Sequence, residues 1–104
     1  MAKTKKFENL EITTYGYECD GKYFKTFSEK LAQELKEGNE YFEYGGYIYE
    51  ICWLWDGIYG TSYEICRYDK SDCIDTGNGA LIIHLPSRMF CGTLVANVWR
   101  YKNV

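Results

Sequence analysis

Histidine and proline are nearly absent from this sequence of 104 residues, with one of each, and its cysteines form no Cys-x-x-Cys pair. Structural zinc needs four cysteine or histidine ligands, usually supplied as close pairs, so we expect no zinc site. No glycine-rich phosphate loop of the Walker or Rossmann type is present either. We therefore predict a protein without a metal or other cofactor.

Long apolar runs are also missing. None approaches the length that spans a bilayer, and the basic start, Met1–Lys6, is not followed by the apolar segment of a signal peptide. Without a signal peptide, five scattered cysteines indicate free thiols in a reducing compartment rather than disulfides. We expect a cytoplasmic protein that does not contact membranes.

Basic residues are too few for electrostatic binding to duplex nucleic acid. The chain has 12 Lys and Arg against 15 Asp and Glu, a formal net charge of -3. Affinity for a duplex rests on cations that neutralise phosphates, so we expect no direct duplex binding, and basic proteins or small molecules remain as partners. An aromatic content of 18%, including 11 tyrosines, argues against disorder and for a packed core.

The longest apolar run, Tyr47–Trp55, is rich in aromatic and β-branched residues. It lies between the turn signals Gly45-Gly46 and Asp56-Gly57, which predicts a long central strand. The two adjacent glycines predict a hairpin with a strand at residues 40–44, in which Tyr44 lies opposite Tyr47.

One amphipathic helix is predicted at about residues 27–37. Thr26 and Glu29 match a capping box at its start, and Gly38 is a typical helix end. Its apolar positions recur at a spacing of four: Phe27, Leu31 and Leu35. This stripe should face the core.

The remaining patterns predict strands and turns. Further strands are expected at residues 10–19, 61–68, 80–85 and 93–101, with a hairpin turn at Asp20-Gly21. Residues 1–8 are expected to be a flexible basic tail, and residues 9–104 a single domain. The predicted fold class is α+β: a single amphipathic helix packed on a curled, mostly antiparallel sheet of about five to seven strands.

Strand periodicity assigns the faces of the sheet. Alternation along residues 47–55 puts Trp53 and Trp55 on the same face as Tyr49, which we assign to the core. Glu50 and Glu64 fall on the opposite face of two neighbouring strands, and unpaired carboxylates are seldom buried, so that face should be at least partly hydrated.

Two loops carry apolar and aromatic residues that are hard to bury. The first is the turn after the central strand, with Trp55, Ile58 and Tyr59; the second lies between the last two strands. Either loop could fold back on the core or remain exposed for a partner. The candidate partner-binding residues are Trp55, Ile58, Tyr59, Glu50, Glu64, Arg88, Met89 and Phe90.

These observations favour a small non-catalytic protein that binds another protein, with self-association into a homodimer as a further expectation. Compact, acidic proteins without motifs are frequent among phage and mobile-element products. By that analogy, one such binding protein would be an inhibitor of a host defence enzyme, similar in kind to an anti-CRISPR protein, whose partner is a basic nucleic-acid-binding enzyme. A first alternative is a small-ligand or nucleotide sponge that uses aromatic stacking with Arg88 or Arg100. A second alternative is a cysteine-dependent hydrolase with Cys91 as nucleophile and His84 as base.

Overall fold

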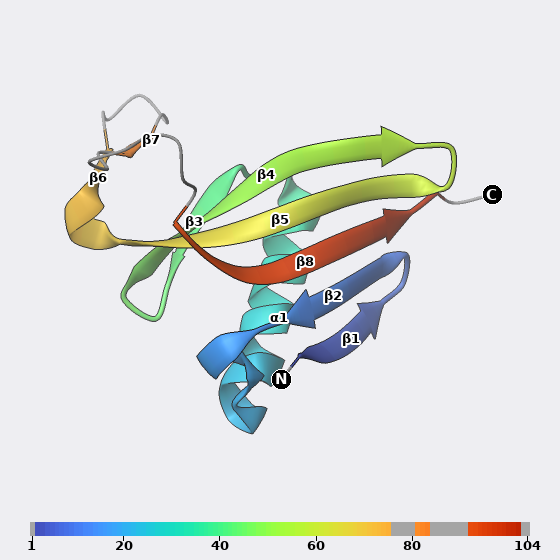
Figure 1. The fold of residues 1–104 in the computed structure, drawn as a ribbon, viewed down its shortest axis with the longest axis horizontal. Helices are drawn as coiled ribbons and strands as arrows, with labels where there is room; N and C mark the ends of the chain where they lie inside the picture. Colours follow the sequence, from blue (N-terminus) through green and yellow to red (C-terminus); the bar gives the residue numbers. More distant parts are fainter. Residues whose placement is uncertain (1, 76–80, 84–91, 103–104) are drawn as a thin grey trace.

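The computed structural model describes residues 2–75, 81–83 and 92–102, and it packs one helix against one face of a curled antiparallel sheet (Figure 1). Across the sheet the strands follow the order β1 (Lys3–Phe7), β2 (Leu10–Thr14), β8 (Thr93–Tyr101), β5 (Gly60–Asp69), β4 (Tyr47–Gly57) and β3 (Tyr41–Tyr44). A separate two-stranded sheet contains β6 (Cys73–Asp75) and β7 (Leu81–Ile83). The predicted α+β class is confirmed.

The hairpin of β3 and β4 has the predicted register. Tyr44 lies opposite Tyr47 and Phe42 opposite Tyr49. The two turn residues, Gly45 and Gly46, have φ values of 58° and 84°, which only glycine adopts without strain. The last strand, β8, also has its predicted bounds.

The helix α1 (Gly21–Glu37) begins six residues before the predicted start, so the capping box at Thr26 and the hairpin at Asp20-Gly21 are both wrong. Asp20 is the residue before the helix, and its carbonyl accepts a hydrogen bond from the Phe24 amide at 2.7 Å. The physical reason is Tyr23, which stacks against Phe27 with ring centroids 6.1 Å apart. It extends the apolar stripe by one turn toward the amino end.

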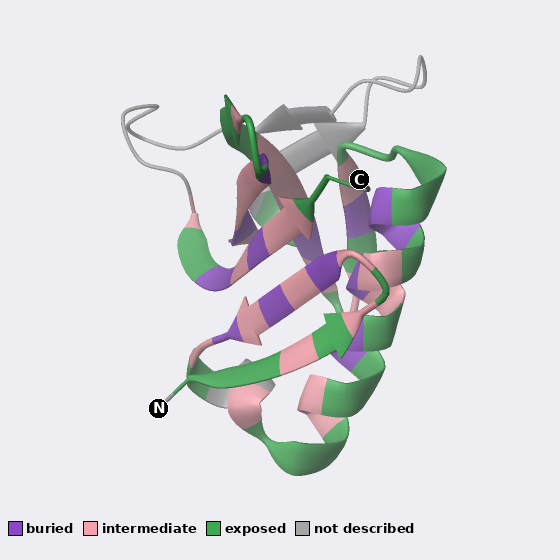
Figure 2. Cartoon of the chain, turned by 90° about the vertical axis from the view of Figure 1, so that its right-hand side faces the viewer, coloured by how far each residue is buried: buried purple, intermediate pink, exposed green. Residues whose placement is uncertain are grey.

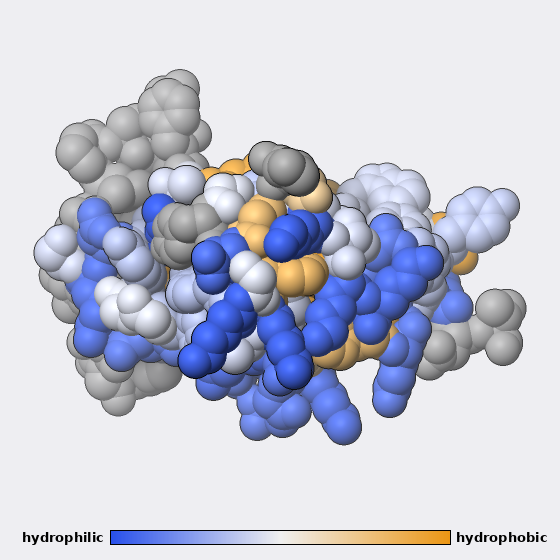
Figure 3. Space-filling view, turned by 90° about the horizontal axis from the view of Figure 1, so that it is seen from below, coloured by the Kyte–Doolittle hydropathy of each residue, from blue (hydrophilic) through white to orange (hydrophobic). Residues whose placement is uncertain are grey.

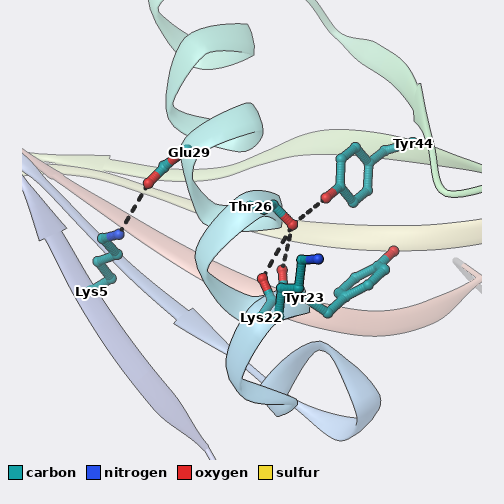
Figure 4. A network of polar contacts seen from close by, with 6 residues as sticks. All are labelled: Lys5, Lys22, Tyr23, Thr26, Glu29 and Tyr44. Atoms are coloured by element: carbon teal, nitrogen blue, oxygen red, sulfur yellow. Dashed lines mark hydrogen bonds and ion pairs between the residues drawn. The ribbon is translucent and has the colours of Figure 1, made fainter.

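Thr26 therefore lies inside the helix, where its hydroxyl donates to the Lys22 and Tyr23 carbonyls and contacts the Tyr44 hydroxyl (Figure 4). One turn further on, the ammonium of Lys5 lies 3.5 Å from the carboxylate of Glu29 and connects β1 to the helix.

The amino-terminal segment differs from its prediction in two places. Residues Lys3–Phe7 are not an unpaired tail; they form the edge strand β1, with Lys5 opposite Ile12. The predicted strand at residues 10–19 ends at Thr14, and a short 3-10 helix, η1 (Gly16–Cys19), leads into α1. A second 3-10 helix, η2 (Lys70–Asp72), follows β5.

The core lies between α1 and the concave face of the sheet. Figure 2 shows buried positions alternating along the strands and gathered on the sheet-facing side of the helix. The buried cluster contains Leu10, Ile12, Phe27, Leu31, Leu35, Phe42, Tyr49, Ile65, Val95, Ala96 and Val98. In Figure 1 the hairpin end of β4 and β5 extends well beyond the helix, so part of the sheet is left uncovered by it.

Candidate functional site

The candidate site begins at a bulge in β4. Trp53 lies opposite Tyr63 of β5 and Trp55 opposite Ser62, so Leu54 is an extra residue without a partner position. A bulge reverses the alternation of faces along its strand. Trp53 therefore shares the inner face with Tyr63, whereas Trp55 lies on the outer face, away from α1; the prediction that both indoles share the core face is wrong.

Three aromatic side chains, which we call the outer aromatic cluster, meet on the outer face: Trp55, Trp99 and Tyr101. Trp55 and Trp99 stack across the intervening strand with ring centroids 5.6 Å apart, and Tyr101 meets Trp99 edge to face at 5.7 Å. Trp55 and Tyr101 are exposed and Trp99 is half-buried. The cluster is held together by ring contacts and open to solvent on one side.

Gly57 fixes the position of the Trp55 indole. A Cβ atom at residue 57 would lie only 2.1 Å from Cη2 of Trp55, because the ring lies across the glycine. This arrangement covers backbone that would otherwise be bare and holds the indole flat on the outer face.

The end of the β4–β5 hairpin projects away from the core. Gly57 pairs with Gly60, which leaves Ile58 and Tyr59 as the two turn residues. Their exposed fractions are 78% and 73%, so this loop does not fold back. We call these two residues the hairpin tip.

Acidic residues continue the outer face beside the outer aromatic cluster. The hydroxyl of Tyr101 donates a hydrogen bond to the carboxylate of Glu11 at 3.1 Å, and the ammonium of Lys6 lies 3.9 Å from the same carboxylate. Partial desolvation, followed by the hydrogen bond to Glu11 and its negative charge, raises the pKa of the Tyr101 phenol. The predicted pair of Glu50 and Glu64 lies on adjacent strands of this face, as expected.

Glu50 is less available to a partner than Glu64. Its Oε1 atom accepts hydrogen bonds from the Tyr68 hydroxyl at 3.0 Å and from the Cys52 thiol at 3.4 Å. A hydrogen bond with Cys66, burial and the charge of Glu50 raise the pKa of the Cys52 thiol well above its usual range. Cys52 is therefore a protonated, poorly nucleophilic thiol.

Two clefts lie on the inner face, on either side of the last turn of α1, where Leu35 packs over Arg100. The Nη2 atom of Arg100 donates a hydrogen bond to the Leu35 carbonyl at 3.1 Å. The guanidinium carbon of Arg100 lies 5.6 Å from the ring centre of Tyr63. The first cleft, of about 500 Å³, lies on the β4 side and includes Ile51, Trp53 and Tyr63 in its lining. The second, of about 570 Å³, lies between α1 and the β1–β2 hairpin.

Five of the predicted site residues lie outside the described residues: His84, Arg88, Met89, Phe90 and Cys91. Among the side chains that the structure describes, no three carboxylate, thiol or imidazole groups come together as a metal site would require.

Comparison with known proteins gives no match, whether with protein-family models, curated proteins or solved structures. Within the described part of the chain, no helix has the length and apolar character needed to cross a membrane.

The sequence-based search missed Trp99 and Tyr101. Alternation along the last strand puts both opposite in parity to Val98, which is buried in the core. No sequence signal indicated this, because the rule used for the central strand puts charged residues outside, and Arg100 has the parity of Val98.

Proposed function

We propose that the protein is a non-catalytic protein-binding protein that binds a basic partner through the outer aromatic cluster. The observation that carries this proposal is the stack of Trp55 on Trp99, exposed on the sheet face that α1 does not cover. Tryptophan and tyrosine dominate the energetics of protein interfaces, because their large rigid rings bury much area at small entropic cost.

The charge of the partner follows from the acidic residues around the outer aromatic cluster. Glu11 and Glu64 lie on the same face, and the chain has a net charge of -3. Opposite charge on a partner would accelerate association. A more specific version of the proposal makes that partner a basic nucleic-acid-binding enzyme of a host defence system, with this chain as its phage or mobile-element inhibitor.

The other two functions have weaker support. A nucleotide sponge would bind phosphate with Arg88, which lies outside the described residues, or with Arg100. The guanidinium of Arg100 contacts the Leu35 carbonyl at the negative end of the helix, and Glu40 lines the same cleft. The hydrolase would use Cys91 and His84, which lie outside the described residues. The raised pKa of the Cys52 thiol makes that cysteine an unsuitable replacement.

The proposal is tested by capturing partners from host lysate on wild type and on Trp55→Ala, then measuring affinity with the purified partner. Trp55→Ala should weaken binding by about 2 kcal/mol or more, the usual threshold of an interface hot spot. Trp53→Ala is the matched control, because it removes an exposed indole from the same strand but from the inner face.

Glu64→Lys should mainly slow association, and more strongly at low salt, because charges at the edge of an interface act over a distance that salt shortens. Equal loss of affinity in Trp53→Ala and Trp55→Ala, or full affinity in Trp55→Ala, would contradict the assignment of the partner to the outer face.

A further inference from the structure

The strand β4 is longer than its neighbour β3 and extends past it. The two strands pair only over Tyr47–Glu50 of β4, followed by one hydrogen bond from the Ile51 amide to the Glu40 carbonyl at 2.7 Å. From residue 52 to residue 57, β5 is the only described strand beside β4. We call this segment the free edge.

The free edge offers backbone groups for pairing. Along a strand, the amide and carbonyl of every second residue point to the same side. Since the Ile51 amide points toward β3, Trp53 directs its amide and carbonyl to that same side, where β3 no longer lies. An extended chain placed here could continue the hydrogen-bonded ladder.

The two edges of the sheet differ in how well they are protected against pairing with another chain. The opposite edge, β1, carries Lys3, Lys5 and Lys6, and the side of the molecule seen in Figure 3 is largely hydrophilic. Lysines on an edge strand oppose pairing with another chain. The free edge instead carries the exposed residues Trp53 and Leu54, with neither lysine nor proline among residues 52–57.

The free edge has an exposed apolar turn at one end and a cleft at the other. One end is the hairpin tip, Ile58 and Tyr59, which is apolar and exposed. The other end, where β3 begins, adjoins the cleft of about 500 Å³ lined in part by Ile51, Trp53 and Tyr63. If two copies pair their free edges antiparallel about a two-fold axis, each tip arrives beside the cleft of the other copy.

The available area suits such a pairing. Aromatic side chains bury about 150–250 Å² each, so Trp53 and the Tyr59 of the hairpin tip, together with the smaller Leu54 and Ile58, could supply roughly 400–600 Å² per copy. A standard interface buries about 800 Å² per partner, and the paired backbones with the cleft walls would supply the rest.

We propose that the chain forms a symmetric homodimer in which residues 52–57 of β4 pair antiparallel with the same residues of a second copy, and each hairpin tip occupies the cleft of the other. Pairing edge to edge extends the sheet without covering its faces. The outer aromatic cluster of each copy stays open, so this dimer does not depend on the proposed partner.

The test is sedimentation equilibrium of the purified full chain over a wide concentration range. Wild type should approach twice the monomer mass of 12.2 kDa. Leu54→Lys introduces a charge on the free edge and should weaken dimerisation at least tenfold. Leu94→Lys is the matched control, because Leu94 has nearly the same exposed fraction (43% against 46%) but lies on the interior strand β8; it should dimerise like wild type.

Circular dichroism confirms folding of each variant, and Tyr59→Asp provides a second, independent disruption at the hairpin tip. Amide hydrogen exchange supplies a direct readout: the Trp53 amide should exchange slowly in wild type and rapidly in Leu54→Lys. A wild type that is monomeric at millimolar concentration, or a folded Leu54→Lys that dimerises as tightly as Leu94→Lys, would overturn the proposal.

Discussion

Replacing Gly57 by alanine places a methyl group where the Trp55 indole now lies. The three heavy atoms nearest to the new Cβ would all belong to the Trp55 ring, at 2.1 Å, 2.5 Å and 2.8 Å, so the indole must move. We therefore expect a folded protein in which the Trp55–Trp99 stack is lost.

The size of the effect follows from three contributions. Losing an aromatic pair costs about 0.5–1.5 kcal/mol. Trp55 is 52% exposed, so swinging it away uncovers roughly 100 Å² of buried surface, worth about 2.5 kcal/mol at ~25 cal/mol/Å². Alanine recovers about 0.5–1 kcal/mol, because glycine loses more backbone entropy on folding. The net loss of stability should be about 2–3.5 kcal/mol.

Urea denaturation of Gly57→Ala, Trp55→Ala and the double variant measures this directly. Once the indole is gone, the three atoms nearest to a Cβ at position 57 are gone as well, so the two changes should be far from additive. In the Trp55→Ala background, Gly57→Ala should be neutral or slightly stabilising. A further loss of 1 kcal/mol or more there would refute the steric explanation.

Leu31→Ala should cost about 2–5 kcal/mol in a urea melt, because Leu31 is fully buried between helix and sheet; a loss below 1 kcal/mol would contradict this packing. Arg100→Met should destabilise the fold by about 1 kcal/mol, since it removes a charged donor from the carbonyl at the end of α1, and an unchanged melt would contradict that contact. Cys52 should resist thiol reagents at pH 8 in the native protein and react after denaturation, while Glu50→Gln should accelerate the native reaction. Since the native pKa of this thiol is raised above its ordinary value, its contribution to stability is complete below about pH 9 and falls at higher pH. Stability that rises above about pH 9 relative to Cys52→Ser would contradict the shift.

The parts of the fold that sequence predicted correctly have strong local signals. Two adjacent glycines determined the β3–β4 register. The bounds of β8 were also predicted correctly, although its pairing with β5 shifts register at Val95. Gly38, in the left-handed conformation, marks the helix end. In each case the local preference and the tertiary packing favour the same structure.

The errors arose where a tertiary contact outweighed a local motif. Asp20-Gly21 is a strong turn signal, yet the rings that Tyr23 contacts favour a longer helix. Residues Lys3–Phe7 lack apolar alternation because an edge strand with a charged side needs none, so nothing in their sequence indicated β1.

For the candidate site, sequence reasoning identified Trp55 but placed it on the wrong face. The bulge at Leu54 cannot be inferred from spacing, because it depends on how β4 pairs with β5. The sequence left open whether the hairpin tip folds back on the core or stays exposed. It stays exposed, because Gly57 pairs with Gly60 and the turn then holds only two residues.

The same bulge has a consequence for how this chain tolerates changes of length. The ladder is regular on both sides of Leu54, and without that residue Trp53 and Trp55 would be consecutive and would alternate between the two faces as they do now. A deletion of Leu54 should therefore leave both indoles on their present faces and the turn unchanged. Divergent relatives with two adjacent aromatic residues at this point would present the same surfaces. Their homology would be found by aligning them by strand pairing rather than by residue spacing.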